Sequence, residues 1–269
     1  MNGPSAAASE DYAIDELRAC VIARDFEDGE RVFLGANVNI GRAAVLLAHR
    51  LHAPNMKVML GLSWTNLTDQ RSVGLHPDST DFRDARWAEC YVNLDTMINS
   101  YRFFSTAFVI SALQIDRFGN SNLIGIGESH TEPRLRGPGS IGSVSSTAYC
   151  DRFYMTPPRH VKEIFVERCD FISSVGWHEG GADARTDLGL PGGGPRFCIT
   201  PLCVFDFETE DKSMRLRSVH PGHTVDEVVE NTGFEFEVPD SVPETEPPRP
   251  EELELLRTTI DTRGLLRET

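Results

Sequence analysis

The chain has 269 residues, of which 40% are hydrophobic and 25% charged, as is usual for a globular protein with a buried core. Its formal net charge is −15, from 41 acidic and 26 basic residues. An acidic surface repels nucleic-acid phosphates and anionic lipid headgroups, which argues against either as a partner. The longest apolar run, 43–48, is far shorter than the roughly 20 residues that a membrane-spanning helix needs.

The N-terminus and the cysteines favour a reduced, cytoplasmic protein. Residues 1–11 lack the basic and apolar regions of a signal peptide, and we predict a disordered tail there. The six cysteines are scattered and include no CxxC pair, which favours free thiols over disulfides and over a zinc site. We therefore expect no bound metal.

The N-terminal part of the chain predicts a βαβ unit. Apolar residues recur at helical spacing over 12–28, and Gly29 would end that helix. A short strand at 31–36, a buried helix at 43–51 and a buried strand at 57–63 follow. Strand, helix and strand within about 30 residues imply a parallel sheet covered by helices.

The middle of the chain begins with a polar stretch, 64–90, that predicts a long loop. The elements expected after it are a helix, a buried strand, a turn and a second strand, at 92–102, 104–115, 116–120 and 122–127. Glycine and serine dominate 133–147, which predicts a loop with an exposed backbone.

The C-terminal part predicts three strands, of which the last two flank a hairpin turn. These strands lie at 162–168, 196–207 and 213–220, and the turn lies at 208–212. Thr224 and Glu227 form a capping-box pattern before a short helix that Gly233 would end. A proline-rich strap at 238–250 and a helix at 251–260 close the chain.

These elements indicate an α/β fold with an open, mostly parallel sheet and helices on both faces. Residues 12–237 would form the α/β domain. Residues 238–269 would form the strap and the last helix, a C-terminal extended arm able to wrap around a neighbouring subunit.

The motif GPGSIG at 137–142, here called the glycine-rich loop, matches the G-x-G-x-x-G pattern of dinucleotide-binding loops. It follows the polar segment PRLR rather than an apolar strand, and Pro138 lies inside it, so its context disfavours nucleotide binding. Glycine-rich backbone can instead direct N–H groups at a thioester oxygen or a phosphate. A mobile surface connection is the alternative.

Two further segments are candidates for function. Glu128 and His130 lie two residues apart and could supply acid–base chemistry if they face a cleft, although a solvated loop is the alternative. Residues 176–197 form a long glycine-rich insertion between two strands, and such loops are usually functional or lie at an interface. Trp177 at its start could anchor packing or contact a partner.

Six segments, in the same order, resemble the β subunits of family I CoA-transferases, in particular those of glutaconate CoA-transferase. They are ALQIDRFGNSNLIGIGESH, the GPGSIG loop, VKEIFVERCDFISSVGW, LGLPGGGP, VHPGHTVDEVVENTGFEFEV and LELLRTTID. The resemblance covers almost the whole chain after residue 12.

The resemblance implies an α/β sheet that pairs with a similar α subunit, as a heterodimer or heterotetramer, with the active site at their interface. In the transferases a glutamate after the second strand attacks the acyl-CoA thioester, and the glycine-rich loop donates backbone N–H groups to its oxyanion. The residues thereby assigned to CoA and oxyanion binding are Gly137, Gly139, Ser140, Gly142 and, in the preceding turn, Asn120. Coenzyme A enters as part of the substrate, and no separate cofactor is expected.

The chain departs from the transferase pattern at the nucleophile. Counted from Ala53-Pro54, the position of the glutamate holds Gly61, and no acidic residue lies within three positions of it. Ser140 also replaces a glycine of the loop. Relatives without the glutamate resemble steroid-ring-cleaving CoA hydrolases, whose carboxylate comes from the α subunit, or decarboxylases with a cysteine at this position.

We therefore expect the β subunit of a heteromeric enzyme that hydrolyses or ring-opens an acyl-CoA without a glutamyl-CoA intermediate. Gly61 and Trp64 would shape the acyl pocket. Glu128 and His130 would transfer protons or orient a water, and the main base would come from the α subunit. The alternatives are a true CoA-transferase whose carboxylate lies elsewhere, such as Asp69, and a non-catalytic scaffold subunit.

Overall fold

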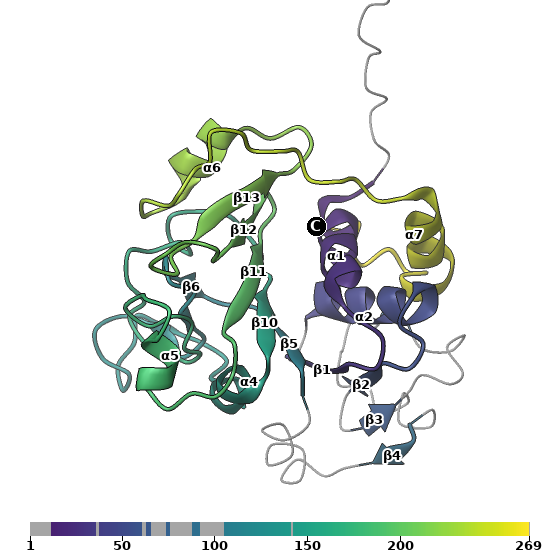
Figure 1. Cartoon of the computed structure of the whole chain (residues 1–269), viewed down its shortest axis with the longest axis horizontal. Helices are drawn as coiled ribbons and strands as arrows, with labels where there is room; N and C mark the ends of the chain where they lie inside the picture. Colours follow the sequence, from purple (N-terminus) through teal and green to yellow (C-terminus); the bar gives the residue numbers. More distant parts are fainter. Residues whose placement is uncertain are drawn as a thin grey trace, which may run out of the picture.

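A mixed sheet runs through the computed structural model, which describes residues 12–35, 38–60, 63–65, 74–75, 88–91, 105–140 and 142–268. Nine described strands lie in the order β13-β12-β11-β10-β5-β1-β2-β3-β4 (Figure 1). The central parallel strands are β1 (Arg31–Leu34), β2 (Lys57–Leu60), β5 (Ala107–Ile110), β10 (Arg152–Met155) and β11 (Pro195–Ile199). The antiparallel strands at the two edges are β12 (Cys203–Asp206), β13 (Arg215–Val219), β3 (Ser63–Thr65) and β4 (Cys90–Tyr91).

Helices cover both faces of the sheet, as predicted. One face packs against α1 (Ile14–Asp25), α2 (Asn39–Leu51), α7 (Pro250–Leu255) and the π-helix η3 (Leu256–Ile260). On the opposite side of the sheet lie α4 (Ser143–Tyr149), α5 (Ala184–Asp187) and α6 (Val225–Asn231) (Figure 1). Side chains alternate along β5, so that Val109 enters the core of the first face and Phe108 the core of the second. This alternation gives the sheet two separate hydrophobic cores.

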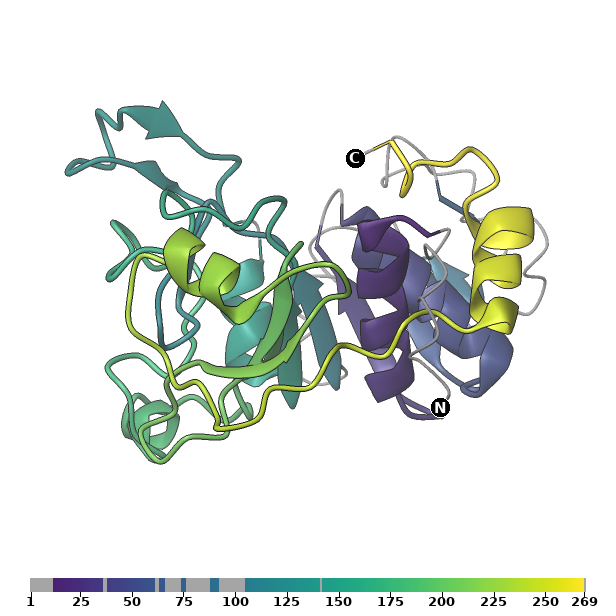
Figure 2. The same cartoon turned by 90° about the horizontal axis from the view of Figure 1, so that it is seen from above.

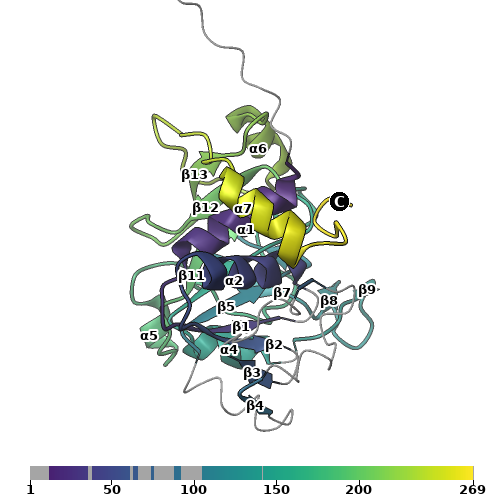
Figure 3. The same cartoon turned by 90° about the vertical axis from the view of Figure 1, so that its right-hand side faces the viewer.

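Two small hairpins follow β5 on the second face. The first pairs β6 (Gln114–Ile115) with β7 (Ser121–Asn122), and the second pairs β8 (Gly125–Ile126) with β9 (Leu135–Arg136). The β8–β9 hairpin projects away from the sheet (Figures 2 and 3). It therefore differs from the β6–β7 hairpin, whose strand residues are all buried.

The C-terminal strap packs against its own chain. It runs beside β13, where the Thr245 N–H donates to the Val219 carbonyl at 2.8 Å. Arg24 of α1 holds its far end through the Glu246 carbonyl at 3.0 Å and the Glu252 carboxylate. Leu256, Ile260 and Leu266 then enter the core shared with α1 and α2. The strap therefore crosses from the β13 edge to the helices of the first face (Figure 1).

Several predicted elements end earlier or break. The first helix ends at Asp25 because Phe26 is extended, and Gly29 lies in the next turn with φ +81°. The predicted strand 104–115 divides into β5 and β6, and the predicted strand 196–207 divides into the hairpin β11–β12. The predicted strand 162–168 is wrong, since only Phe165 makes an isolated bridge, to Ile115.

Other differences concern helix ends and loops. Thr224 caps α6 by accepting from the Glu227 N–H at 3.1 Å, but the Glu227 carboxylate pairs with His223, so only half of the capping box forms. The helix ends at Asn231, two residues before Gly233. The predicted loop 133–147 contains the start of α4. The predicted loop 64–90 overlaps β3 at its first residues and β4 at its last. The predicted tail 1–11 and helix 92–102 lie outside the described residues.

The described helices include none that is both long and apolar enough to cross a membrane. All five cysteines whose side chains are described are free and buried, namely Cys20, Cys150, Cys169, Cys198 and Cys203.

Candidate active site

The connections of the sheet reverse direction between two of its central strands. Strands β1 and β5 are parallel neighbours, and the chain passes from β1 to β2 on one side and from β5 to β10 on the other. Helix α2 follows β1 on the first face, and α4 follows β5 on the second. Ligands of open α/β sheets bind at the carboxyl ends of strands at such a switch point. The carboxyl ends of β1 and β5, at Leu34 and Ile110, are therefore the candidate site.

The glycine-rich loop is held at this edge of the sheet. The N–H groups of Gly137 and Gly139 donate to the carbonyls of Ile124 and Leu123, each at 2.9 Å. A Cβ atom at residue 137 would collide with the Leu123 carbonyl and lie 2.7 Å from Leu113 Cδ1. Only glycine therefore allows the loop to lie so close to the chain that leaves β5.

The hydrogen bonds of the loop change the assignment of its donors. The Gly139 N–H was expected to face an oxyanion, but it is already bonded to the Leu123 carbonyl. Among the described residues, the N–H groups of Ser140 and Gly142 have no acceptor. The Ser143 hydroxyl is also buried without a partner. In the described part of the loop, the free donors are therefore at Ser140 and Gly142, where Gly142 adopts φ +77°.

Asn120 is committed to the protein itself. Its Nδ2 donates to Asp116 Oδ2 at 2.9 Å and to the His178 carbonyl at 2.7 Å. Its Oδ1 accepts from the N–H groups of Gly176 at 2.9 Å and His178 at 3.2 Å. The side chain is 1% exposed and has no capacity left for CoA, which corrects its predicted binding role. Burial raises the pKa of Asp116 to about 6, although hydrogen bonds from Asn120 act to lower it.

Glu128 and His130 lie at the tip of the β8–β9 hairpin, and both are exposed. Two contacts hold the tip: the Gly127 N–H donates to Asp170 Oδ2 at 2.8 Å, and Arg136 donates to the His130 carbonyl at 3.1 Å. Within the described part of the chain neither the Glu128 carboxylate nor the His130 ring has a hydrogen-bond or ion-pair partner. The described contacts of this chain therefore do not hold them against the glycine-rich loop.

The predicted acyl pocket lies largely beyond the described residues. Gly61 and Asp69 are outside them, as is the side chain of Trp64, whose backbone pairs with Met59 in β3. The described part of β2 ends at Leu60, parallel to β1, so position 61 directly follows the carboxyl end of a central strand.

Sequence reasoning missed Arg185, which organises the 176–197 insertion. Its side chain is 2% exposed and donates to backbone carbonyls of Gly192 (2.8 Å), Val175 (2.7 Å) and Thr147 (2.7 Å). No signal in the sequence identifies it, because its acceptors are backbone groups. Trp177 packs, partly buried, against the core of the second face, and Lys212 Nζ lies over its ring, 5.3 Å from the centroid.

A buried histidine pair lies beyond the ends of β10 and β13. His160 bonds to the hydroxyls of Thr200 at 2.8 Å and Thr232 at 2.9 Å. His220 bonds to the Thr245 hydroxyl and the Thr200 carbonyl, each at 2.9 Å. Burial lowers the pKa of His160 to about 3 and of His220 to about 4, so both rings are neutral and structural. No three His, Cys, Asp or Glu side chains in the described ranges are arranged to hold a metal ion.

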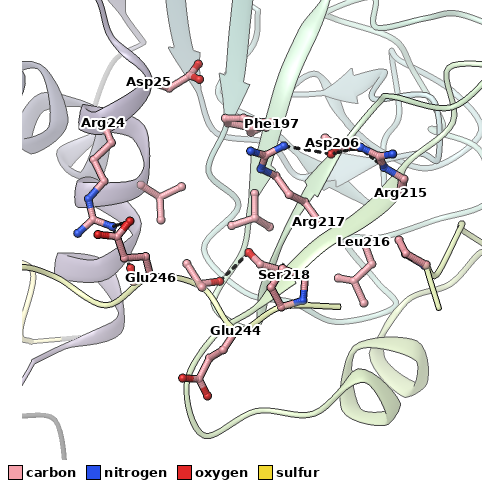
Figure 4. Close-up of a pocket in the computed structure, with 15 residues that line it drawn as sticks. Arg24, Asp25, Phe197, Asp206, Arg215, Leu216, Arg217, Ser218, Glu244 and Glu246 are labelled. Atoms are coloured by element: carbon pink, nitrogen blue, oxygen red, sulfur yellow. Dashed lines mark hydrogen bonds and ion pairs between the residues drawn. The ribbon is translucent and has the colours of Figure 1, made fainter. Parts of the chain in front are cut away.

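A surface hollow of about 540 Å³ lies away from the carboxyl ends of β1 and β5. It is bounded by α1, β12, β13 and the strap (Figure 4). Its charged groups neutralise one another, since Asp206 pairs with Arg215 at 2.8 Å and with Arg217 at 3.5 Å. None of its lining residues belongs to the glycine-rich loop. We therefore place the candidate site at the switch point.

Known proteins resemble the chain over nearly its whole length. The B subunit of glutaconate CoA-transferase from Acidaminococcus fermentans is 30% identical, over 93% of this chain and 93% of its own. The cholesterol ring-cleaving hydrolase IpdB subunit of Mycobacterium tuberculosis is 28% identical, over 93% of this chain and 95% of its own.

Solved structures share the fold. The crystal structure of glutaconate coenzyme A-transferase from Acidaminococcus fermentans superposes with a TM-score of 0.81 at 28% identity, over 95% of this chain and 97% of that one. The decarboxylase AibA/AibB superposes with a TM-score of 0.80 at 21% identity, over 95% and 98%, a likeness of fold alone. The sequence pattern of the family described as coenzyme A transferase matches residues 104–231, which include the glycine-rich loop. The chain therefore belongs to the coenzyme A transferase family, as a family I β subunit.

Proposed function

We propose that this chain is the β subunit of a heteromeric enzyme that binds an acyl-CoA thioester at the carboxyl ends of β1 and β5. The enzyme cleaves the acyl group by hydrolysis or by ring-opening carbon–carbon cleavage, not by CoA transfer. The observation that carries this proposal is Gly61, which stands where the resemblance places the attacking glutamate. A glycine has no side chain that could form an acyl-enzyme. A relative described as a ring-cleaving hydrolase, with near-complete coverage, supports the same chemistry.

The residues of this chain would supply electrostatic stabilisation and shape. When a water oxygen attacks the thioester carbon, the carbonyl oxygen becomes negative, and the free N–H groups of Ser140 and Gly142 would donate to it. The carbon–sulfur bond then breaks and CoA leaves as a thiolate, while the proton of the water passes to a base. We assign that base to the α subunit.

The other residues would have supporting roles. Gly61 and Trp64 would leave room for a bulky or cyclic acyl group. Glu128 and His130 remain second-rank candidates for proton transfer or for orienting the water, because the partner would first have to enclose their exposed hairpin tip. Coenzyme A would enter as part of the acyl-CoA substrate, and no separate cofactor would be needed. We propose a cytoplasmic location, because scattered cysteines without a CxxC pair favour a reducing compartment.

The decisive experiment measures the fate of CoA. The complex with its α partner is incubated with an acyl-CoA, and we expect water to be the only co-substrate. Thioester hydrolysis would release free CoA, whereas ring opening would add one water to the acyl group and leave the thioester intact. Added acetate should not accelerate the release, and mass spectrometry should find no CoA adduct on this subunit. Efficient exchange of CoA between two acids, with ping-pong kinetics, would show that the enzyme is a transferase.

CoA transfer is the second candidate activity, because the relative that is 30% identical over 93% of this chain is described as a CoA-transferase subunit. In that case the carboxylate would come from Asp69 or from the partner. The two candidate activities share one prediction: the chain alone is inactive, and co-expression with the α partner gives a stoichiometric complex. Turnover of acyl-CoA by the purified monomer would contradict both.

A further inference from the structure

The upstream flank of the glycine-rich loop is tied to the 173–176 segment by a continuous series of hydrogen bonds. Leu123, whose carbonyl holds the Gly139 N–H, donates its own N–H to the Ser173 hydroxyl at 3.0 Å. Ser121 and Ser174 exchange backbone hydrogen bonds in both directions, at 2.9 and 3.1 Å. The position of this flank therefore depends on where the 173–176 segment lies.

The downstream flank of the loop is α4, which is only seven residues long and starts directly after Gly142. Its inner residues Ser143, Ser146 and Thr147 are buried. The Ala148 carbonyl, in its last turn, accepts from the Gly192 N–H at 3.0 Å. Because so short a helix moves as one body, its C-terminal contacts also fix where it begins.

Arg185 connects the two flanks directly. One terminal nitrogen, Nη1, donates to the carbonyls of Val175 and Gly176, at 2.7 and 3.0 Å. The other, Nη2, donates to the carbonyl of Thr147 in α4 at 2.7 Å. Among the described residues it has no carboxylate partner, so its buried charge is compensated only by carbonyls in this arrangement. A planar guanidinium fixes the relative positions of these groups more strictly than a flexible ammonium could.

We propose that Arg185 is a positioning residue of the thioester site: its guanidinium clamps both flanks of the glycine-rich loop and so fixes the free N–H groups of Ser140 and Gly142. The inference rests on the proposed function. It also gives the long 176–197 insertion a role, as the scaffold that carries this arginine. Displacement of oxyanion donors by about 1 Å is enough to lower turnover by roughly 100-fold.

The test compares Arg185→Lys with Arg18→Lys in the complex with the α partner. Arg18 is a matched control, because it is 1% exposed and also donates to backbone carbonyls, those of Pro157 and Ile199, at 2.6 and 2.8 Å. It does not contact the loop or α4. Both variants should lose thermal stability. Only Arg185→Lys should lower kcat, by about 10- to 100-fold, with KM changed less than about threefold.

Amide hydrogen exchange of the Arg185→Lys and Arg18→Lys variants measures the mobility of the loop without depending on enzyme activity. Amides within 137–149 should exchange faster in Arg185→Lys than in wild type, and at the wild-type rate in Arg18→Lys. Equal exchange in the two variants, or an equal loss of kcat, would overturn the positioning role. If the wild-type complex neither hydrolyses an acyl-CoA nor opens its ring, the proposed function fails, whereas the exchange measurement still decides the positioning role.

If Arg185→Lys fails to fold, Gly192→Ala offers a second way to displace α4. A Cβ atom at residue 192 would collide with the Cys150 carbonyl and lie 2.9 Å from that of Ala148, so the end of α4 must shift while Arg185 remains. We expect the same loss of kcat and the same faster exchange. Wild-type turnover and exchange in this variant would contradict the proposal.

Discussion

The β8–β9 hairpin and the glycine-rich loop are adjacent in sequence, but the hairpin is exposed and the loop is held by hydrogen bonds. The hairpin exposes Glu128 and His130 at its tip and has few contacts with the body of the molecule. The loop has no ionisable side chain, but hydrogen bonds hold it on both sides, through Leu123 and through α4. The segment with ionisable side chains is therefore the less firmly held of the two, and the better-anchored segment is the one held by backbone hydrogen bonds.

The largest expected effect comes from breaking the anchored region at Asn120. In Asn120→Asp a carboxylate replaces the amide group that donates to Asp116 and to the His178 carbonyl. Two buried carboxylates would then face each other, and one must bind a proton. We expect a loss of roughly 3 kcal/mol in the free energy of unfolding, measured by urea titration at pH 7.5.

The matched control for this change is Asn55→Asp. Asn55 donates to Asp28 through Nδ2 at 2.8 Å, as Asn120 does to Asp116, but at an exposed position. Water screens the new repulsion there, so the effect should be much smaller. Equal losses for the two variants would show that burial of Asn120 does not matter.

Acidification should weaken the anchored region by an amount that grows as the pH falls. The backbone of Phe165 forms a bridge with Ile115 of β6. Its ring stacks on His160, with ring centroids 4.3 Å apart. Because the folded pKa values of His160 and His220 are about 3 and about 4, the unfolded chain binds more protons below pH 6.5. Stability should therefore fall as the pH drops from about 6.5 towards 4, by up to about 1.4 kcal/mol per pH unit for each histidine.

Urea midpoints at pH 7.5 and pH 5 measure this dependence. Asp116, whose pKa is raised to about 6, opposes it, because the folded state then binds more protons than the unfolded state between pH 4 and 6. His160→Gln should flatten the profile below pH 6.5. An unaltered profile in His160→Gln would contradict the assignment.

The smallest expected effect belongs to the exposed hairpin. Glu128→Gln and His130→Asn should each change kcat of the complex by less than about threefold, because no hydrogen bond or ion pair from the described residues orients either side chain. A loss above tenfold at unchanged stability would show that the partner encloses the tip and uses one of them.

Apolar periodicity allowed the β1–α2–β2 unit to be predicted from the sequence, because these elements bury whole faces in the two cores. The same reasoning failed at 162–168. There Ile164 and Phe165 are buried but form no strand ladder, so their apolar pattern resembles that of a strand in the sequence. The glycine-rich loop was found from its composition. Arg185 and the structural role of Asn120 could not be found in this way, because both bond mainly to backbone groups that every residue has.

The strap and the C-terminal helix also determine the order in which this protein can be completed during synthesis. Helix α1 is the first described element to leave the ribosome, but its Glu16 pairs with Arg257 at 2.8 Å and its Arg24 pairs with Glu252 at 2.6 Å. The nascent α1 therefore cannot make both ion pairs until residue 257 has been made. A premature stop before Glu252 would leave α1 without them and more exposed to proteases and chaperones.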